Sequence, residues 1–137
     1  DSFNVEEGHV IPSLIAKFYE AQLHGSSVSA WGTGSAIRDF TYSSDISEAL
    51  IKIFQNLTGA VNMGSGYRHA IREIVNVLQE ETGVAVDWDS SKPDGQLVRY
   101  YNLDRLKSTG FSASVPLPEG IRTTYNWFKE NASSARR

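Results

Sequence analysis

The sequence predicts a mixed α/β domain built from amphipathic helices and short strands. Long segments carry apolar residues at helical spacing, as residues 9–23 do with Val10, Leu14 and Phe18. Short apolar runs such as Val28–Trp31 lie between them and end in glycine-rich turns. The strands are too few in series for a complete doubly wound sheet. With 137 residues, of which 40% are hydrophobic, the chain is long enough for one domain with a real core.

The first half of the chain is expected to supply two helices and two strands. Pro12 fits the first turn of the first helix, where a missing backbone N–H costs little, and Gly25 ends that helix. Ser43, Ser44 and Asp45 offer caps for the second helix. The predicted elements are a helix over residues 9–23, strands over Val28–Trp31 and residues 37–42, and a helix over residues 43–57 that turns Ile46, Ala49, Leu50 and Ile53 inward.

The second half is expected to add further short strands and helices. A Gly64-Ser65-Gly66 turn follows a buried strand, and Gly83 ends the helix after it. The predicted elements are strands over residues 60–63, 84–88 and 97–101, helices over residues 69–82, 104–108 and 118–131, and a polar loop over residues 90–96. We place the domain at residues 1–131 and expect residues 132–137 to form a frayed polar tail.

Composition excludes several classes of protein. A formal net charge of −3 gives no electrostatic footprint for nucleic acid. The absence of cysteine excludes a disulfide scaffold, a thiolate zinc site and a cysteine nucleophile, and we predict no metal site. No apolar run approaches the roughly 20 residues of a membrane span. No signal peptide is visible, so we expect a cytoplasmic protein without membrane or nucleic-acid partners. The opening Asp1-Ser2-Phe3-Asn4 has the character of the middle of a loop, which predicts a fragment or a gene cut at a domain edge.

Several short phrases occur in an order and spacing that resemble one enzyme family. The phrases are His9-Val10-Ile11-Pro12, Trp31-Gly32-Thr33-Gly34, Arg38-Asp39-Phe40, Asn62-Met63-Gly64-Ser65-Gly66, Ser91-Lys92-Pro93-Asp94-Gly95 and Glu119-Gly120-Ile121. Together they resemble the C-terminal part of NAD(P)-dependent epimerase/dehydratases, which are extended short-chain dehydrogenase/reductases. Among these, the chain is most similar to enzymes that epimerise and reduce GDP-4-keto-6-deoxymannose. The resemblance covers nearly the whole chain.

The resemblance implies a small α/β substrate-binding domain without the Rossmann half. In the full-length family that half binds NADP(H) or NAD and carries a catalytic Tyr-x-x-x-Lys pair, so this chain is expected to bind no cofactor and to be inactive alone. The pairs Gly32/Gly34 and Gly64/Gly66 lack the third glycine of a dinucleotide fingerprint and are better explained as turns. Tyr125 and Lys129 have the Tyr-x-x-x-Lys spacing, but any helix produces such pairs by accident.

His9 and Lys17 are the candidates on the first helix. His9 matches the general acid of the family, and an imidazole titrates close to working pH; the alternative is a residue that caps or packs the helix start. Lys17 lies eight residues further on, about 12 Å along the axis. The resemblance implies that it reaches the diphosphate of the substrate; the alternative is a solvated lysine.

Trp31 and Arg38 are the candidates on the strands. The resemblance implies that Trp31 contacts substrate, while a core aromatic is the alternative. It also implies that Arg38 grips the diphosphate, because a guanidinium offers a planar fork for phosphate oxygens. The alternative for Arg38 is a structural ion pair with Asp39 or Asp45.

Lys92 and Asp94 lie in a Pro/Gly loop that gives no packing reason for their charges. The resemblance implies that this loop contacts the nucleotide, and a plain solvated turn is the alternative. The chain departs from the family pattern at Ser43-Ser44-Asp45 and at Tyr67-Arg68-His69, where the sequence suggests no function.

The sequence therefore predicts the sugar-nucleotide-binding part of a nucleotide-sugar epimerase/reductase, with a nucleotide-diphosphate sugar and a Rossmann domain as partners. Loss of that domain would expose an apolar face and favour self-association. A stand-alone binding or interaction module derived from such an enzyme, or part of a UDP- or dTDP-sugar epimerase or dehydratase, are the alternatives.

Overall fold

Three long helices enclose the main core in the computed structural model, which describes residues 1–136. They are α1 (Val10–His24), α3 (Ile71–Thr82) and α5 (Leu117–Asn131), and each packs against the other two. Phe18, Leu78 and Phe128 contribute fully buried side chains, one from each helix. The three predicted helices are confirmed within two residues at each end, because each carries a clear apolar period of its own.

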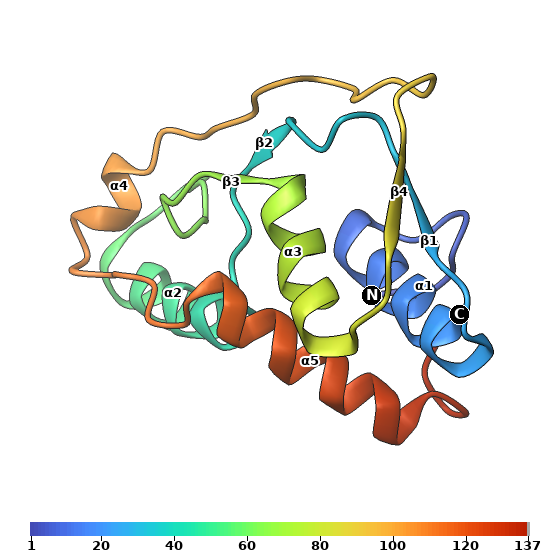
Figure 1. Cartoon of the computed structure of the whole chain (residues 1–137). Helices are drawn as coiled ribbons and strands as arrows, with labels where there is room; N and C mark the ends of the chain where they lie inside the picture. Colours follow the sequence, from blue (N-terminus) through green and yellow to red (C-terminus); the bar gives the residue numbers. More distant parts are fainter. Residues whose placement is uncertain (137) are drawn as a thin grey trace.

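The main core is closed on one side by a parallel pair of strands, β1 (Val28–Trp31) and β4 (Val86–Asp89). Gly25 ends α1 in the left-handed conformation with φ 65°, and the chain then turns into β1. Figure 1 shows this pair beside α1, with α5 running below α1 and α3. Alternation along β1 buries Val28 and exposes Trp31, so the strand presents the indole outward at its end.

The other predicted strands are short or absent. β2 (Ile37–Arg38) pairs antiparallel with β3 (His69–Ala70), so the strand predicted over residues 37–42 is only two residues long. The segment predicted as a strand over residues 97–101 makes a single bridge, Ile37 to Val98. The predicted strand over residues 60–63 is wrong: no strand forms there, and Ala60 and Asn62 are exposed. A strand needs a partner, and residues 1–136 offer none to this segment.

A second, smaller core lies under α2 (Ser43–Asn56) and α4 (Asp104–Lys107), on the left of Figure 1. Ala49 of α2 packs there with Leu103, Leu106 and Phe111. The predicted inward position of Leu50 is wrong, since this side chain is 51% exposed. The helix is amphipathic as predicted, but little of the described chain covers its apolar face.

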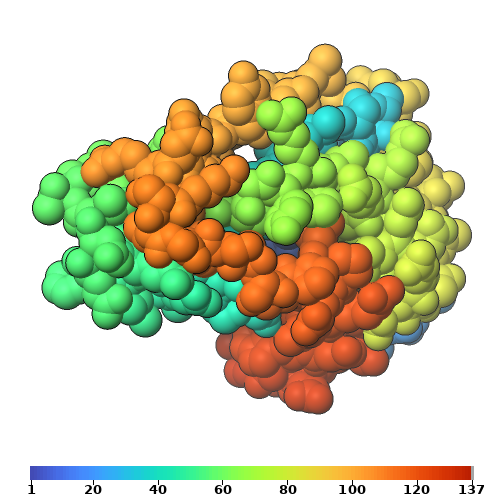
Figure 2. Space-filling model, turned by 90° about the vertical axis from the view of Figure 1, so that its left-hand side faces the viewer, coloured from blue at the N-terminus to red at the C-terminus, as the bar shows by residue number. Residues whose placement is uncertain are grey.

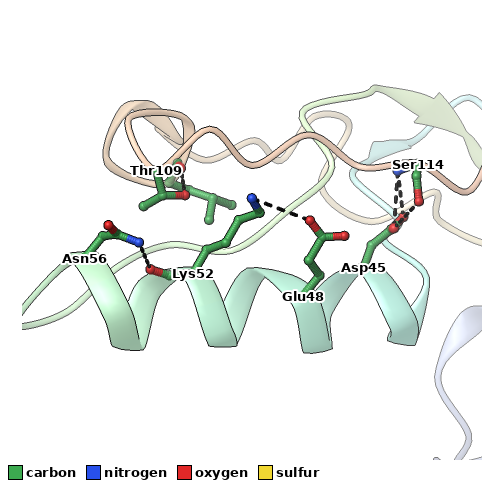
Figure 3. Close-up of polar contacts among 7 residues, drawn as sticks. Asp45, Glu48, Lys52, Asn56, Thr109 and Ser114 are labelled. Atoms are coloured by element: carbon green, nitrogen blue, oxygen red, sulfur yellow. Dashed lines mark hydrogen bonds and ion pairs between the residues drawn. The ribbon is translucent and has the colours of Figure 1, made fainter.

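Asp45 fixes the start of α2 to the segment before α5, as Figure 3 shows. Its buried carboxylate accepts hydrogen bonds from the backbone N–H and hydroxyl of Ser114 and from the N–H of Val115. Burial acts to raise the pKa of Asp45, but these hydrogen bonds outweigh it and hold the pKa below its ordinary value.

The residues after α5 contact the main core. Ala132 and Ala135 pack against it, and the Phe3 N–H donates a hydrogen bond of 2.8 Å to the Arg136 carbonyl. Arg137 lies outside the described residues. No helix within residues 1–136 is long and apolar enough to cross a membrane.

Candidate substrate-binding site

Trp31 carries two lysine ammonium groups over its ring. The Lys17 Nζ lies 5.7 Å from the ring centroid and the Lys92 Nζ lies 5.6 Å from it. Lys17 comes from α1 and Lys92 from the loop after β4. Such cation–π contacts contribute about 0.5–1 kcal/mol each at exposed sites. The structure thus brings together three of the predicted substrate-binding residues around an indole that is 64% exposed.

Lys17 and Trp31 also line a hollow of about 510 Å³ between α1, β1, α3 and β4. Most of its lining is apolar, with Leu14, Val75 and Trp88 among its members. The volume falls within the range of small-molecule sites, which are mainly apolar with a few polar groups. An open groove of about 400 Å³ along α1 and β1 also includes Lys17 and Trp31. These two residues therefore lie where the two hollows meet.

Asp94 fixes the loop that carries Lys92 beside the Trp31 ring. Its Oδ1 accepts hydrogen bonds from the backbone N–H groups of Thr33 at 2.7 Å and Gly34 at 3.2 Å, and its Oδ2 accepts one from the Thr33 hydroxyl at 2.7 Å. A Cβ on Gly32, whose φ is 74°, would overlap the Asp94 Oδ1, so only glycine permits this approach. Hydrogen bonds from Thr33 lower the pKa of Asp94. Asp94 therefore holds the loop that carries Lys92 against the turn after β1.

Arg38 and Asp39 do not pair with each other. The Arg38 Nη1 donates a hydrogen bond of 2.7 Å to the carbonyl of Ile37, its own neighbour. Asp39 accepts hydrogen bonds from the Ser65 N–H at 2.9 Å and the Gly66 N–H at 2.8 Å, and it fixes that turn as Asp94 fixes the other. Within residues 1–136 Arg38 forms no ion pair with Asp39 or Asp45.

His9 precedes α1 with an exposed side chain. Its carbonyl accepts the Ser13 N–H at 3.0 Å, and no hydrogen bond from its ring caps the helix in the described chain. Its chain neighbours Gly8 and Val10 both line the 510 Å³ hollow. His9 therefore lies next to the lining of the hollow, and no hydrogen bond or ion pair with residues 1–136 engages its ring.

The chain has extensive similarity to known proteins. The NAD dependent epimerase/dehydratase family matches residues 2–64. A probable GDP-L-fucose synthase 1 from Oryza sativa subsp. japonica is 37% identical over 100% of this chain and 43% of its own length, and GDP-L-fucose synthase 1 from Arabidopsis thaliana is 35% identical over 96% and 42%. The crystal structure of a GDP-L-fucose synthetase from Naegleria fowleri bound to NADP superposes with a TM-score of 0.90 at 30% identity, covering 100% of this chain and 45% of that one.

The chain is a homologue of the NAD dependent epimerase/dehydratase family. It has the mixed α/β fold of the C-terminal part of GDP-L-fucose synthases and spans less than half the length of these relatives. The predicted resemblance and fold class are thus confirmed.

The glycine pairs of this epimerase/dehydratase homologue are turns, as predicted. Gly32, Gly34 and Gly66 have φ of 74°, 70° and 81°, and the carboxylates of Asp94 and Asp39 accept the hydrogen bonds of the two turns. A dinucleotide phosphate needs those backbone donors free and no anion beside them. Neither turn therefore fits NADP.

The Tyr-x-x-x-Lys pair on α5 is structural. Tyr125 is 1% exposed, its hydroxyl donates a hydrogen bond of 2.8 Å to the Gln22 Oε1, and burial raises its pKa. The Lys129 Nζ lies 5.7 Å from the Tyr125 ring centroid. A buried, hydrogen-bonded tyrosine in the main core does not meet a substrate.

One contributor to the site, Arg72, is not among the residues that the sequence indicates. The sequence also gives no sign that Asp39 fixes the turn at Ser65 and Gly66, away from the hollow at Trp31. Arg72 lies over the Trp88 ring at 5.8 Å, and its Nη2 donates a hydrogen bond of 2.6 Å to the Thr33 carbonyl. A position in the first turn of a helix does not indicate that Arg72 contacts Thr33, which is far away in the chain. The described chain has no group of three His, Asp or Glu side chains that could hold a metal ion.

Proposed function

We propose that this domain binds the nucleotide-diphosphate part of a GDP-sugar, as the substrate-binding half of a nucleotide-sugar epimerase/reductase. The observation that supports this most is the exposed Trp31 with Lys17 and Lys92 over its ring, at the edge of a largely apolar hollow. An indole face suits the flat or apolar part of a ligand, and two ammonium groups suit its phosphates. The names of the relatives, GDP-L-fucose synthases, supply the GDP-sugar.

The cations have different roles in this proposal. Lys17 provides a point charge at the edge of the hollow. Arg38 provides a planar fork, of which only Nη1 is engaged by the Ile37 carbonyl, so Nη2 and Nε keep donors for phosphate oxygens. Lys92 adds a second point charge from the loop that Asp94 holds in place. The diphosphate carries most of the substrate's charge, so these cations dominate affinity.

His9 is proposed as the general acid of the epimerisation, acting on the sugar beside its 4-keto group. Its exposed ring and its place next to the hollow leave it available to exchange a proton with a ligand. In the full-length enzyme a Rossmann domain would hold NADP(H), which supplies the hydride for the reduction. This chain's own residues would hold the diphosphate and donate the proton.

Binding to the chain itself tests this proposal. Calorimetry or ligand-detected NMR should show GDP-mannose binding better than guanosine, because only the former carries the diphosphate. Arg38→Ala should erase most of that advantage, since a charge-assisted contact is worth about 1.5–3 kcal/mol. Arg38→Lys should restore part of it, because an ammonium lacks the planar fork. Lys17→Ala should reduce it as well.

Lys52→Ala is the matched control, because Lys52 lies on α2 and pairs with Glu48 at 3.7 Å. It should bind GDP-mannose like the unmodified chain. If the diphosphate gives no advantage over guanosine, or if Lys17→Ala and Arg38→Ala both leave the advantage intact, the proposal is wrong. UDP-glucose in place of GDP-mannose tests the choice of nucleotide.

A further inference from the structure

A second hollow lies on another part of the molecule, between the turn at residues 66–68 and the segment at residues 99–107. Its volume is about 190 Å³, and its lining shares no residue with the hollow at Trp31. In Figure 2 it lies between the light green of the first segment and the orange of the second. Asp39 lines it, whereas the neighbouring Arg38 of the proposed diphosphate site does not.

Three cationic side chains line this hollow: Arg68, Arg99 and Lys107. All three are exposed, and none forms an ion pair within residues 1–136. The Arg68 guanidinium lies over the Tyr100 ring at 5.0 Å, which orients its planar fork. The Arg99 Nε makes one long hydrogen bond of 3.3 Å to the Gln96 side chain.

The two carboxylates that line the same hollow already accept hydrogen bonds from other groups of the chain. Asp39 accepts hydrogen bonds from the N–H groups of Ser65 and Gly66 and from the hydroxyls of Thr41 and Ser65. Asp104 accepts one from the Asn102 side chain at 3.1 Å. The three cations outnumber the two carboxylates of this lining, which leaves a net positive charge at the hollow in a chain whose formal net charge is −3. Such a local excess is the electrostatic environment that an anion selects.

The remaining lining adds hydroxyl donors. Tyr67, Tyr100 and Tyr101 line the hollow and are 59%, 67% and 46% exposed. A tyrosine hydroxyl can donate a hydrogen bond to a phosphate oxygen. The hollow is smaller than the roughly 300 Å³ of the smallest usual ligand pockets. Its contents are therefore limited to a phosphate with a small attached group.

We propose that Arg68, Arg99 and Lys107 form a second anion site that binds a phosphate group, either free or on a small ester such as a pentose phosphate. The forks of the two arginines provide paired donors to phosphate oxygens, and Lys107 provides a point charge. This proposal gives a role to Tyr67 and Arg68, which lie where the chain departs from the family pattern. It does not depend on the GDP-sugar site, with which it shares no residue.

The test is an NMR titration of the 137-residue chain with ribose 5-phosphate, inorganic phosphate and ribose. Ribose 5-phosphate should give saturable shifts at the amides of residues 66–68 and 99–104. Arg68→Ala should weaken its binding about tenfold or more, and Arg68→Lys should weaken it less. Arg68 is exposed, so neither change should disturb the fold, as the unchanged remainder of the spectrum will show.

Lys17→Ala is the cross-control, because it should weaken GDP-mannose binding and leave ribose 5-phosphate binding unchanged, while Arg68→Ala should do the reverse. Equal binding of inorganic phosphate would identify free phosphate as the source, and tighter binding of ribose 5-phosphate would identify an ester. Both results support the site. The proposal fails if ribose binds equally well, if no saturable shift occurs at these amides, or if Arg68→Ala binds ribose 5-phosphate unchanged.

Discussion

The Asp94 carboxylate holds both the backbone N–H and the hydroxyl of Thr33, each at 2.7 Å. Residues 61 positions apart in the chain are thereby joined, and the turn after β1 is fixed to the loop after β4. Trp31 and Lys92 lie on either side of this junction, and they contact each other. The carboxylate that the sequence suggested as a nucleotide contact is thus engaged in positioning the lysine beside it.

Acid should release this junction. Hydrogen bonds from Thr33 lower the pKa of Asp94, so its contribution to stability is present above the pKa of the unfolded chain and is lost as the pH falls through the folded value. The amides of Thr33 and Gly34 should shift together during acid titration by NMR. In Asp94→Asn this step should disappear and GDP-mannose binding should weaken, whereas Asp87→Asn should behave as the unmodified chain does. A Thr33 titration that persists in Asp94→Asn would contradict the assignment.

His9 should matter for turnover and not for binding. His9→Asn keeps a polar side chain at an exposed position, so the fold and GDP-mannose affinity should be unchanged. In the enzyme completed by a Rossmann domain, epimerisation should fall about 10²–10⁴-fold, the usual contribution of a general acid. Steady-state kinetics with matched calorimetry separates the two effects. Equal turnover by the variant would remove the proposed role.

Asp45 should be the most sensitive polar position of the smaller core. Its side chain is 2% exposed and holds Ser114 and Val115. Asp45→Ala would leave these donors without a partner and should cost about 1–3 kcal/mol in the free energy of unfolding. Urea denaturation measures this loss. Glu48→Ala, on the same helix but exposed, should change stability by less than about 0.5 kcal/mol. Similar losses in both variants would show that the helix and not the carboxylate is responsible.

Gly120 should resist a change that usually favours a helix. Alanine is better than glycine inside a helix by about 1 kcal/mol. In α5, however, a Cβ at Gly120 would lie 2.9 Å from a ring carbon of Tyr42. Gly120→Ala should therefore destabilise the chain by about 1–3 kcal/mol, as overpacking does. Adding Tyr42→Ala should reverse the sign of the Gly120→Ala effect, measured by thermal unfolding as a double-mutant cycle. A stabilised single variant would show that the ring moves aside.

The elements predicted correctly are those whose determinants are local. Helix α1 carries its apolar period and its Gly25 stop within its own segment, and β1 is bounded by turns. The predicted strand over residues 60–63 failed because strand formation depends on a partner. Leu50 was misplaced because a helical period defines an apolar face without saying what covers it.

In the candidate site, too, the sequence indicates individual residues but not the contacts between distant parts of the chain. Resemblance supplied Lys17, Trp31 and Lys92, but only the structure places both ammonium groups over the ring. The contacts of Asp94 and Arg72 with the turn at Thr33 join residues far apart in the chain. No periodicity or short motif encodes such pairs, so sequence reasoning could not find them.

The apolar face of α2 should drive self-association of the chain. Leu50, Ile51 and Phe54 are 51%, 59% and 90% exposed on this one helix, and a contiguous exposed apolar surface favours association. We expect this face to be the one that a Rossmann domain covers in the proposed full-length enzyme. Sedimentation velocity over a wide concentration range should show reversible association of the unmodified chain.

Ile51→Gln/Phe54→Gln should shift this equilibrium toward monomer without loss of stability, because both side chains project into solvent. The matched control is Leu23→Gln on α1, which removes an equally exposed leucine, 64% exposed, away from α2. It should associate like the unmodified chain. If the control dissociates as readily as the double variant, association does not depend on α2. If the unmodified chain is monomeric at every concentration, an apolar helix face of this size is too small to hold two copies together. Any partner that covers this face of α2 would then have to bury a larger surface elsewhere, as a covalently joined domain does.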